Sequence, residues 1–414
     1  MGTQRSQADF GVVVVSDFAF VNGGAPKVAI ETALALAGSG RPVVFFGASG
    51  DPDPRLAAAG VRVVVLKIEP HNRRPPSLHN LRSGIWDHHT AASFASLLES
   101  LPSDRPWVVH IHAFMDALTS SVPAVARRSG RPTLFTLHDY GMGCPYGTFY
   151  DVRRRRQCPL AGLSAACWMT NCTSSAYPRK LFRNLRLAVQ RRRGIPWPTA
   201  TYAAVSSYAA ERIRPYLPQD ARLLVLHNPI PIEKRELVEV GQNQSFVFLG
   251  AITEVKGVRL LAQAATQTHT PVRFVGDGPL RPKLSARYPG FEWLGWQEPP
   301  VVERVLRQSR ALVFPSVLHE TAGMVVQEAV ARGLPAVVPD RCAAREFVVD
   351  GETGLIFQSG DADSLAETLE RLKSDSLVSQ MGRNAFERYW SAPFTPERYR
   401  TELESIFLSI LEAS

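Results

Sequence analysis

The chain has 414 residues, of which 45% are hydrophobic and 21% are charged, a composition typical of a soluble α/β protein with two or three domains. No apolar run reaches the roughly 18 residues that a membrane span needs, which excludes an integral membrane protein. The amino terminus is polar and shows no signal peptide. We therefore expect a cytoplasmic protein whose five cysteines are reduced unless they bind metal.

The net charge of +9 arises almost entirely in one segment. Between residues 152 and 193 there are eleven Lys or Arg residues and no Asp or Glu, which leaves 9 − 11 = −2 for the rest of the chain. Such a run is either a solvated basic face or a surface that binds an anionic partner.

Strand and helix patterns alternate along nearly the whole chain, which predicts two parallel sheets with helices on both faces. The first series of predicted strands covers residues 12–16, 43–47, 61–66, 107–112, 133–138, 203–206 and 223–226. The second series covers residues 246–249, 272–275, 291–294, 311–315 and 336–338. Because the Pro-rich, polar stretch 227–241 separates the two series, we predict a first domain at 1–228 and a second at 229–390, followed by a terminal segment at 391–414.

The loops after the first series of strands hold the first candidate ligand contacts, because ligands of doubly wound folds bind at the carboxyl ends of the strands. Gly23 and Gly24 follow the first strand and allow a close backbone approach to a ligand, although a plain turn has the same pattern. His110 and His112 end the fourth strand on one face, with His112 nearer the cleft, and His138 ends the next strand. Because two neighbouring strand ends carry such histidines, we expect them to line the ligand site, with a purely structural role as the alternative.

Two loops of the second series indicate phosphate binding. Lys256 follows the strand at 246–249 and can reach a phosphate, or it is an exposed lysine at a helix start. Gly276 and Gly278 form a glycine-rich turn after the next strand. Residues 350–355 indicate a surface hairpin or turn with no chemistry.

Two carboxylates, Glu320 and Glu328, are the most informative pair in the chain. Glu320 lies in the loop after a buried strand, near the start of a helix predicted at 324–331, and Glu328 lies further along that helix. Helix starts favour anions, so a carboxylate there indicates the hydroxyl groups of a bound phosphorylated sugar. An ordinary βαβ unit with an acidic cap is the alternative.

Four of the five cysteines, Cys144, Cys158, Cys167 and Cys172, lie within 29 residues of one another in an insert at about 141–197. The insert contains no Cys-x-x-Cys pair, so a zinc-ribbon signature is not met. Four close thiols still allow a structural zinc site, with buried or loosely paired thiols as the alternative.

The stretch 179–197 within the insert carries basic residues beside a partial apolar stripe of Leu181, Phe182, Leu185 and Val189. A basic amphipathic helix with aromatic neighbours fits an anionic membrane surface. Nucleic acid is not expected as a partner, because no recognised binding fold appears.

Taken together, these residues resemble the retaining nucleotide-sugar glycosyltransferases of family 4, which have the GT-B fold of two Rossmann-like domains facing a central cleft. The resemblance covers almost the whole chain and is strongest from 246 to 357. Its components are Gly23-Gly24, His112, Lys256-Gly257, Gly276-Asp277-Gly278-Pro279, the pair Glu320 and Glu328, and Asp350-Gly351-Glu352-Thr353-Gly354.

The resemblance implies a role for each matching residue. Glu328 would bind the donor ribose and Glu320 the transferred sugar, with the amides through Gly323 and Met324 near the diphosphate. Lys256 would balance the charge of the leaving diphosphate, which Gly23 and Gly24 would face from the other domain. His112 would lie beside the anomeric centre. The helix within 391–414 would cross back to the first domain.

The function implied is transfer of a sugar from a UDP- or GDP-linked donor to a saccharide or lipid-linked acceptor, in assembly of a bacterial surface polysaccharide or glycolipid. No Asp-x-Asp pattern stands out as a metal site, so we expect transfer without a metal or other cofactor. The alternative among enzymes is a GT-B epimerase or phosphorylase, although no context is found for the lysine that would hold pyridoxal phosphate in a phosphorylase.

One position departs from the family pattern. Members usually carry Arg after the glycine that matches Gly250, but this chain has Ala251. Arg259, Arg281 or Arg345 could supply the missing cation, and a catalytically lapsed protein that binds a nucleotide sugar or a partner glycosyltransferase is the alternative.

Overall fold

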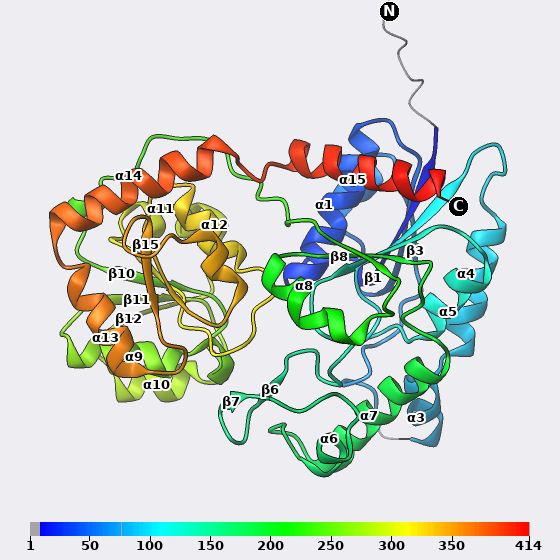
Figure 1. Ribbon diagram of the computed structural model, residues 1–414, viewed down its shortest axis with the longest axis horizontal. Helices are drawn as coiled ribbons and strands as arrows, with labels where there is room; N and C mark the ends of the chain where they lie inside the picture. The colour runs from blue at the N-terminus through cyan, green and yellow to red at the C-terminus, as the bar shows by residue number, and fades with distance from the viewer. Residues whose placement is uncertain (1–8, 76, 414) are drawn as a thin grey trace, which may run out of the picture.

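The computed structural model describes residues 9–75 and 77–413, so the outer ends of the predicted segments 1–228 and 391–414 lie outside the described residues. It contains two large parallel sheets, which lie side by side in Figure 1. We call residues 9–225 together with α15 (Pro396–Glu412) the first half, and residues 246–391 the second half.

The sheet of the first half has seven parallel strands in the order β3-β2-β1-β4-β5-β8-β9. Its central run, Val12 to Val15, is fully buried, as expected for a parallel strand covered by helices on both faces. The strands are β1 (Gly11–Phe18), β2 (Val43–Ser49), β3 (Arg62–Val65), β4 (Trp107–Ile111), β5 (Thr133–Leu137), β8 (Thr201–Ala204) and β9 (Arg222–Val225). The helices around this sheet are α1 (Gly24–Gly38), α2 (Pro54–Ala58), α3 (Leu78–Ile85), α4 (His88–Glu99), α5 (Ser121–Arg128) and α8 (Ser207–Ile213), with the 3₁₀ turn η1 (Arg214–Tyr216).

The sheet of the second half has six parallel strands in the order β12-β11-β10-β13-β14-β15. The strands are β10 (Phe246–Leu249), β11 (Val272–Val275), β12 (Glu292–Gly295), β13 (Leu312–Val313), β14 (Ala336–Pro339) and β15 (Gly354–Phe357). The helices are α9 (Val258–Gln267), α10 (Arg281–Arg287), α11 (Pro299–Arg307), α12 (Met324–Val330), α13 (Ala362–Arg371) and α14 (Asp375–Ser391). Three 3₁₀ turns, η2 (Val240–Gln242), η3 (Glu254–Lys256) and η4 (Ala343–Phe347), complete the element order.

These sheets confirm the predicted fold class, and every predicted strand has a counterpart. Three strands were missed. The turn at 350–353 leads into β15, which pairs with β14 at the edge of the second sheet, and the insert holds two short strands described below. The strand predicted at 311–315 is shorter than expected, because only Leu312 and Val313 have regular strand geometry.

The insert between β5 and β8 forms a small, loop-rich unit below the first sheet in Figure 1. It contains the two-stranded antiparallel ribbon of β6 (Tyr150–Asp151) and β7 (Arg156–Gln157), the short helix α6 (Ala165–Met169) and the helix α7 (Tyr177–Arg192). α7 packs beside α3, where a side chain on Gly84 would collide with the ring of Phe182.

The last helix leaves the second half and returns to the first. α14 lies along the second sheet, whereas α15 packs onto the core that contains β1 and α1, as the red helix in Figure 1 shows. Phe407 contacts Phe10 edge-on at 5.8 Å between ring centroids, and the hydroxyls of Tyr399 and Thr32 are 2.9 Å apart. None of the helices in the described ranges is both long and apolar enough to cross a bilayer.

Candidate active site

A cavity of about 510 Å³ opens at the carboxyl ends of β1, β2, β4 and β5 in the first half. Gly23, Gly24, His112 and His138 all line it, so the structure brings these residues of the first half together. The loop after β5 and the side chain of Arg183 on α7 form the far wall.

Gly23 and Gly24 face open space. A methyl group added to either glycine would meet no atom within 4 Å, so the packing of the protein itself does not require glycine there. The space beside both glycines is therefore available to a ligand.

Three imidazoles form a neutral cluster beside the cavity: His112 and His138 line it, and the fully buried His110 packs against His112 with the ring centroids 4.1 Å apart. His112 Nδ1 lies 3.0 Å from His138 Nε2, and His110 Nε2 lies 2.8 Å from the hydroxyl of Thr136. Burial lowers the pKa of His138 to about 4 and that of His110 to about 3, and burial together with the other two imidazoles lowers the pKa of His112 well below its ordinary value. His112 Nε2 is buried and has no hydrogen-bond partner among the described residues, so it can bind a group of the ligand.

Asp17 is a site residue that sequence reasoning did not identify. Its buried carboxylate accepts four backbone hydrogen bonds, from Met115, Asp116, Ala117 and Leu118, at 2.7 to 3.0 Å. These bonds fix the loop after β4, part of which lines the cavity. The only signal in the sequence is an acidic residue near the end of a buried strand.

On the second half, the structure brings Lys256 and Glu320 into direct contact. Lys256 Nζ lies 2.6 Å from Glu320 Oε1, which also accepts a hydrogen bond from the Ser316 hydroxyl at 2.6 Å. Both side chains remain partly exposed, Lys256 at 30% and Glu320 at 16%. The pair therefore borders solvent and can exchange partners when a ligand arrives.

The other predicted donor-binding glycines are packed against the protein itself. A side chain on Gly276 would meet the Gly250 carbonyl oxygen at 1.9 Å, and one on Gly278 would meet the Ile252 carbonyl oxygen at 2.5 Å. A side chain on Gly323 would lie 2.8 Å from the Ala344 Cβ. These glycines let neighbouring strand-end loops approach each other, so their presence has a structural reason independent of any ligand.

Glu328 and Met324, both on α12, contact the first half rather than an empty donor site. Glu328 Oε1 lies 3.8 Å from Lys27 Nζ, which belongs to the first turns of α1. Met324 is half-buried and packs against the core below α15. The two predicted donor loops, at Gly24 and at Met324, therefore face each other across the cleft.

Of the three arginines considered as substitutes at Ala251, Arg259 alone pairs with a residue of η3, the turn that carries Lys256. Arg259 donates to Glu254, Arg281 donates to Asp277, and Arg345 donates to the Asp340 carbonyl. Arg281 lies against Gly295, on the same edge of the sheet as the Gly276 turn.

The two Asp-x-Asp sequences of the chain, at 51–53 and 361–363, lie at helix starts. Asp53 caps α2 and bonds to Arg55, and Asp361 caps α13. These carboxylates therefore already have local roles in the protein.

The four clustered cysteines line one small cavity together with Lys180. Lys180 is 1% exposed, and its ammonium donates to Cys167 Sγ at 3.4 Å. Burial raises the pKa of Cys158 and of Cys172, which favours protonated thiols. Across residues 9–75 and 77–413, no group of three or more His, Cys, Asp or Glu side chains is arranged to hold a metal ion.

The structure thus gives the predicted zinc site at Cys144, Cys158, Cys167 and Cys172 no geometric support, because an ammonium group already lies among the thiols. The zinc site stays a prediction. Elemental analysis tests it directly: about one zinc per chain would support it, and metal-free folded protein would end it.

α7 differs from the predicted amphipathic helix in its orientation. Lys180 and Arg186 are buried, whereas Leu181 and Leu185 are exposed. The Arg186 guanidinium donates to the Leu118 carbonyl at 3.3 Å, so part of the basic run holds the insert against the first half.

Two parallel sheets whose strand-end loops lie toward each other have the architecture of the GT-B class. Residues 22–234 match the family described as Glycosyltransferase Family 4, and residues 243–375 match the group described as Glycosyl transferases group 1. The chain therefore belongs to glycosyltransferase family 4.

Similar proteins include the D-rhamnosyltransferase WbpZ of Pseudomonas aeruginosa, 30% identical over 35% of this chain and 40% of that protein. The O-antigen chain mannosyltransferase C of Escherichia coli is 25% identical over 42% of this chain and 48% of that protein. The matched stretches thus span less than half of these curated relatives.

Among solved structures, Alr3699/HepE of Anabaena in complex with UDP aligns over 96% of this chain and 100% of that one, with a TM-score of 0.68 and 16% identity. The sucrose-phosphate synthase of Thermosynechococcus elongatus aligns over 98% of this chain and 100% of that one, with a TM-score of 0.71 and 16% identity. At this identity the likeness shows a shared fold.

Proposed function

We propose that this protein transfers a sugar, with retention of configuration, from a UDP- or GDP-linked donor to a saccharide or lipid-linked acceptor in the synthesis of a surface polysaccharide or glycolipid. The observation that carries the proposal is the Lys256–Glu320 pair. Its loop bonds through Thr321 to His138, which lines the cavity together with Gly23, Gly24 and His112.

The chemistry follows from where charge develops. Breaking a bond between a sugar and a diphosphate builds negative charge on the leaving phosphate, and a fixed cation at that phosphate stabilises the transition state. Lys256 supplies this cation in the proposal, and its exchange from Glu320 to the diphosphate frees the Glu320 carboxylate to accept hydrogen bonds from the sugar hydroxyls. Glu328 accepts hydrogen bonds from the donor ribose after leaving Lys27.

The acceptor occupies the cavity of the first half in this proposal. Its attacking hydroxyl approaches the anomeric carbon on the same face that the diphosphate leaves, and no protein nucleophile or metal is required. The neutral imidazole of His112, with its unpaired Nε2, binds a hydroxyl of the transferred sugar or of the acceptor.

The comparisons support a nucleotide-sugar donor and a glycan product. The two relatives above bear the names of a rhamnosyltransferase and a mannosyltransferase, and a solved neighbour contains UDP-glucose. The mannosyltransferases of Mycobacterium tuberculosis and Mycolicibacterium smegmatis are named as GDP-mannose-dependent, so the base of the donor has to be measured.

A thermal-shift panel of UDP, GDP and their sugar conjugates tests the donor. A ligand at a hundredfold excess over its Kd stabilises the native state by about 2.7 kcal/mol. We expect a selective shift with one nucleotide class and release of that nucleotide when an acceptor is added. A shift without any release of nucleotide would favour a lapsed, binding-only protein, and no shift at all would contradict the proposal.

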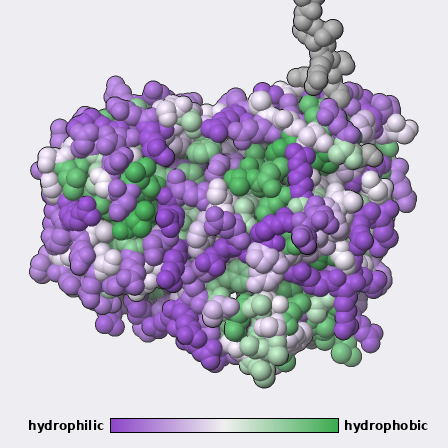
Figure 2. Space-filling model, viewed as in Figure 1, coloured by the Kyte–Doolittle hydropathy of each residue, from purple (hydrophilic) through white to green (hydrophobic). Residues whose placement is uncertain are grey.

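We also propose that the enzyme works at the cytoplasmic face of an anionic membrane. Six large apolar side chains are exposed on α3, α6 and α7, which we call the α3–α7 patch: Leu78, Leu81, Met169, Tyr177, Leu181 and Leu185. Arg82 on α3, Arg179 and Arg192 on α7, and Arg193 directly after α7 are also exposed. Figure 2 shows a hydrophobic area at the lower edge of the molecule, where Figure 1 places α6 and α7.

Apolar side chains with a basic border fit the interface of anionic lipids, where each nearby Lys or Arg contributes about 1 kcal/mol. Arg183 on the same helix lines the acceptor cavity and stacks over the Tyr146 ring at 4.6 Å. With the patch on the membrane, the lipid part of an acceptor would stay in the bilayer beside α7, and its saccharide part would reach the cavity that Arg183 lines.

Cosedimentation with phosphatidylserine-containing vesicles tests this placement. We expect binding that weakens at least tenfold in Leu181→Ser/Leu185→Ser and in vesicles of phosphatidylcholine alone. Val225→Ser, which removes an exposed apolar side chain from β9, is the matched control. Equal binding of all three proteins would contradict a role for the patch.

A further inference from the structure

The loop that carries Glu320 is held by both halves. Val255 and Ala343 bond to it within its own half, and three further bonds join it to the opposite half. His319 and Thr321 flank Glu320 on either side, and both bond to the first half. The hydroxyl of Thr321 donates to the His138 carbonyl at 2.7 Å, and the hydroxyl of Ser206 donates to the Thr321 carbonyl at 2.7 Å. The loop therefore bridges the cleft immediately beside the proposed catalytic pair.

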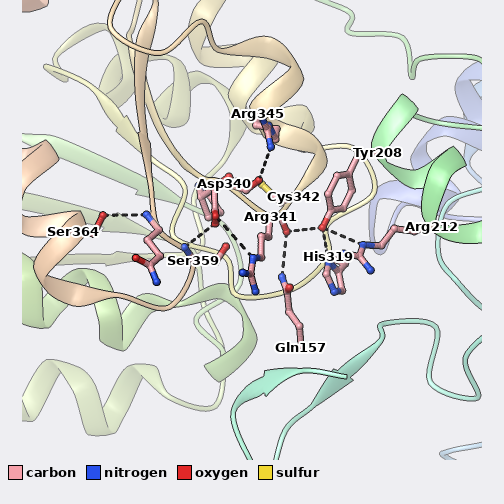
Figure 3. A network of polar contacts seen from close by, with 12 residues as sticks. Gln157, Tyr208, Arg212, His319, Asp340, Arg341, Cys342, Arg345, Ser359 and Ser364 are labelled. Carbon is pink, nitrogen blue, oxygen red and sulfur yellow. Dashed lines mark hydrogen bonds and ion pairs between the residues drawn. The ribbon is translucent and has the colours of Figure 1, made fainter. Parts of the chain in front are cut away.

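Tyr208, in the first turn of α8, makes the bond on the other side of Glu320. Its hydroxyl contacts His319 Nδ1 and donates to the Arg341 carbonyl at 2.9 Å. The same hydroxyl accepts a hydrogen bond from Arg212 Nε at 3.3 Å. Figure 3 shows Tyr208 and Arg212 reaching from α8 toward the loops of the second half.

The His319 imidazole is suited to a fixed bond. It is 4% exposed, and burial together with the nearby Arg212 and Arg341 lowers its pKa to about 3. A neutral, buried imidazole keeps the same protonation state throughout the physiological range, so its bond to Tyr208 does not change with pH there.

The backbone of α8 is anchored to the same region. The Glu346 carboxylate accepts hydrogen bonds from the amides of Ser207 and Tyr208 at 3.2 and 2.6 Å. From the insert, Gln157 donates to the same Arg341 carbonyl at 3.2 Å, and Arg155 lies 3.3 Å from Glu254, two residues before Lys256. Contacts from the first half thus surround the Lys256–Glu320 pair.

We propose that Tyr208 is a positioning residue for the transfer reaction. It fixes residues 319–321 from the opposite half and so sets the place of Glu320 beside Lys256, in addition to the bonds from Ser316 and Ala343 that hold Glu320 within its own half. Tyr208 touches neither the donor nor the acceptor; it acts through His319 and the Arg341 carbonyl. The proposal rests on the proposed transferase function.

Tyr208→Phe tests the proposal, because it removes the hydroxyl and keeps the ring that lies 5.9 Å from the His319 ring. We expect kcat to fall about tenfold, because the bonds of the hydroxyl to His319 and to the Arg341 carbonyl are lost, with the donor KM changed less than about twofold. Amide hydrogen exchange in the segment 316–324 should become faster while the melting temperature stays the same.

Thr321→Val removes the bond to the His138 carbonyl, on the side of Glu320 opposite to His319. It should likewise lower kcat and leave the donor KM almost unchanged. Tyr216→Phe is the matched control, because that hydroxyl bonds to the Gly162 backbone within the first half. An unchanged kcat in both Tyr208→Phe and Thr321→Val overturns the proposal, whatever the exchange rates. If the wild-type protein transfers no sugar, the proposed function fails, and unchanged exchange in 316–324 still overturns the positioning role.

Discussion

The two walls of the cleft use glycine for opposite purposes. In the first half, Gly23 and Gly24 border open space, and a side chain there would touch nothing in the protein. In the second half, Gly276, Gly278 and Gly323 are pressed against the backbone or side chains of neighbouring loops. A glycine in a ligand-binding loop can thus keep room for the ligand or allow two loops to meet, and only the structure distinguishes the two cases.

The first way to test this contrast is to add one methyl group on each wall. Gly276→Ala should destabilise the protein by about 3 kcal/mol, because Gly276 has a φ of 133° and its new Cβ would collide with the Gly250 carbonyl. Gly23→Ala should leave the melting temperature unchanged and weaken donor binding about tenfold, because the methyl takes ligand space. Thermal denaturation and nucleotide titration of both variants measure the difference, and equal destabilisation would break the comparison.

The second test concerns the charge on the second wall. Lys256→Ala should lower kcat about a hundredfold, since removal of one group that stabilises developing negative charge has an effect of that size. Lys283→Ala, on the exposed face of α10, is the control for loss of a lysine from the same half. If Lys256→Ala raised only the donor KM, Lys256 would bind the ground state and would have no special role in the transition state.

A third test separates ligand binding from contact between the walls. Glu328→Ala should raise the donor KM about tenfold by removing the acceptor of the ribose hydroxyls, with little change in kcat. Lys27→Ala removes the other partner of the 3.8 Å ion pair and should change the KM by less than a factor of three, because exposed pairs contribute little. Equal effects of the two variants would assign the role to the ion pair and contradict ribose binding.

The smallest effect concerns the buried imidazoles of the first wall. The pKa of His138 is about 4 in the folded protein and 6.5 ordinarily, so the unfolded chain binds the extra proton between these values. Above pH 6.5, His138 is neutral in both states and does not change the free energy of unfolding. As the pH falls from 6.5 toward 4, the unfolded chain binds a proton that the folded protein does not bind, so the free energy of unfolding decreases. We expect His138 to account for a loss of about 1 kcal/mol between pH 6.5 and 5.5, measured by denaturation with urea.

His138→Asn should reduce the loss of stability in that range by about 1 kcal/mol, while His110, His112 and His319 still contribute to it. A His269→Asn variant, which changes a histidine in the second half, should retain the wild-type dependence. A wild-type stability that is flat from pH 6.5 to 5.5 would show that the imidazoles are not held neutral.

The sequence predicted the sheets well because buried parallel strands are continuous apolar runs between turn residues, as in Val12 to Val15. It missed β15, whose four residues follow a turn and are too short for a periodic pattern. The short spacing of the four cysteines along the chain also predicted that they lie close together, as they do. Nothing in the sequence indicated that Lys180 would lie among them.

The return of the last helix to the first half was predicted from the resemblance, but the individual side-chain contacts between the halves were not. Lys27 and Glu328 lie 301 residues apart (328 − 27), and their approach depends on how the two sheets face each other. The bonds of Tyr208 to His319 and Arg341 depend on the same packing, so no local pattern around Tyr208 marks them.

The return of α15 to the first half has a consequence for synthesis of the protein. Tyr399, Leu403, Phe407 and Ile410 complete the core around β1 and α1, yet the ribosome makes them after the whole second sheet. At roughly 5–20 residues per second, the 170 residues between 226 and 395 take on the order of ten seconds or more. During that time the nascent first half carries an uncovered apolar groove, which makes it a client for chaperones until its last helix emerges.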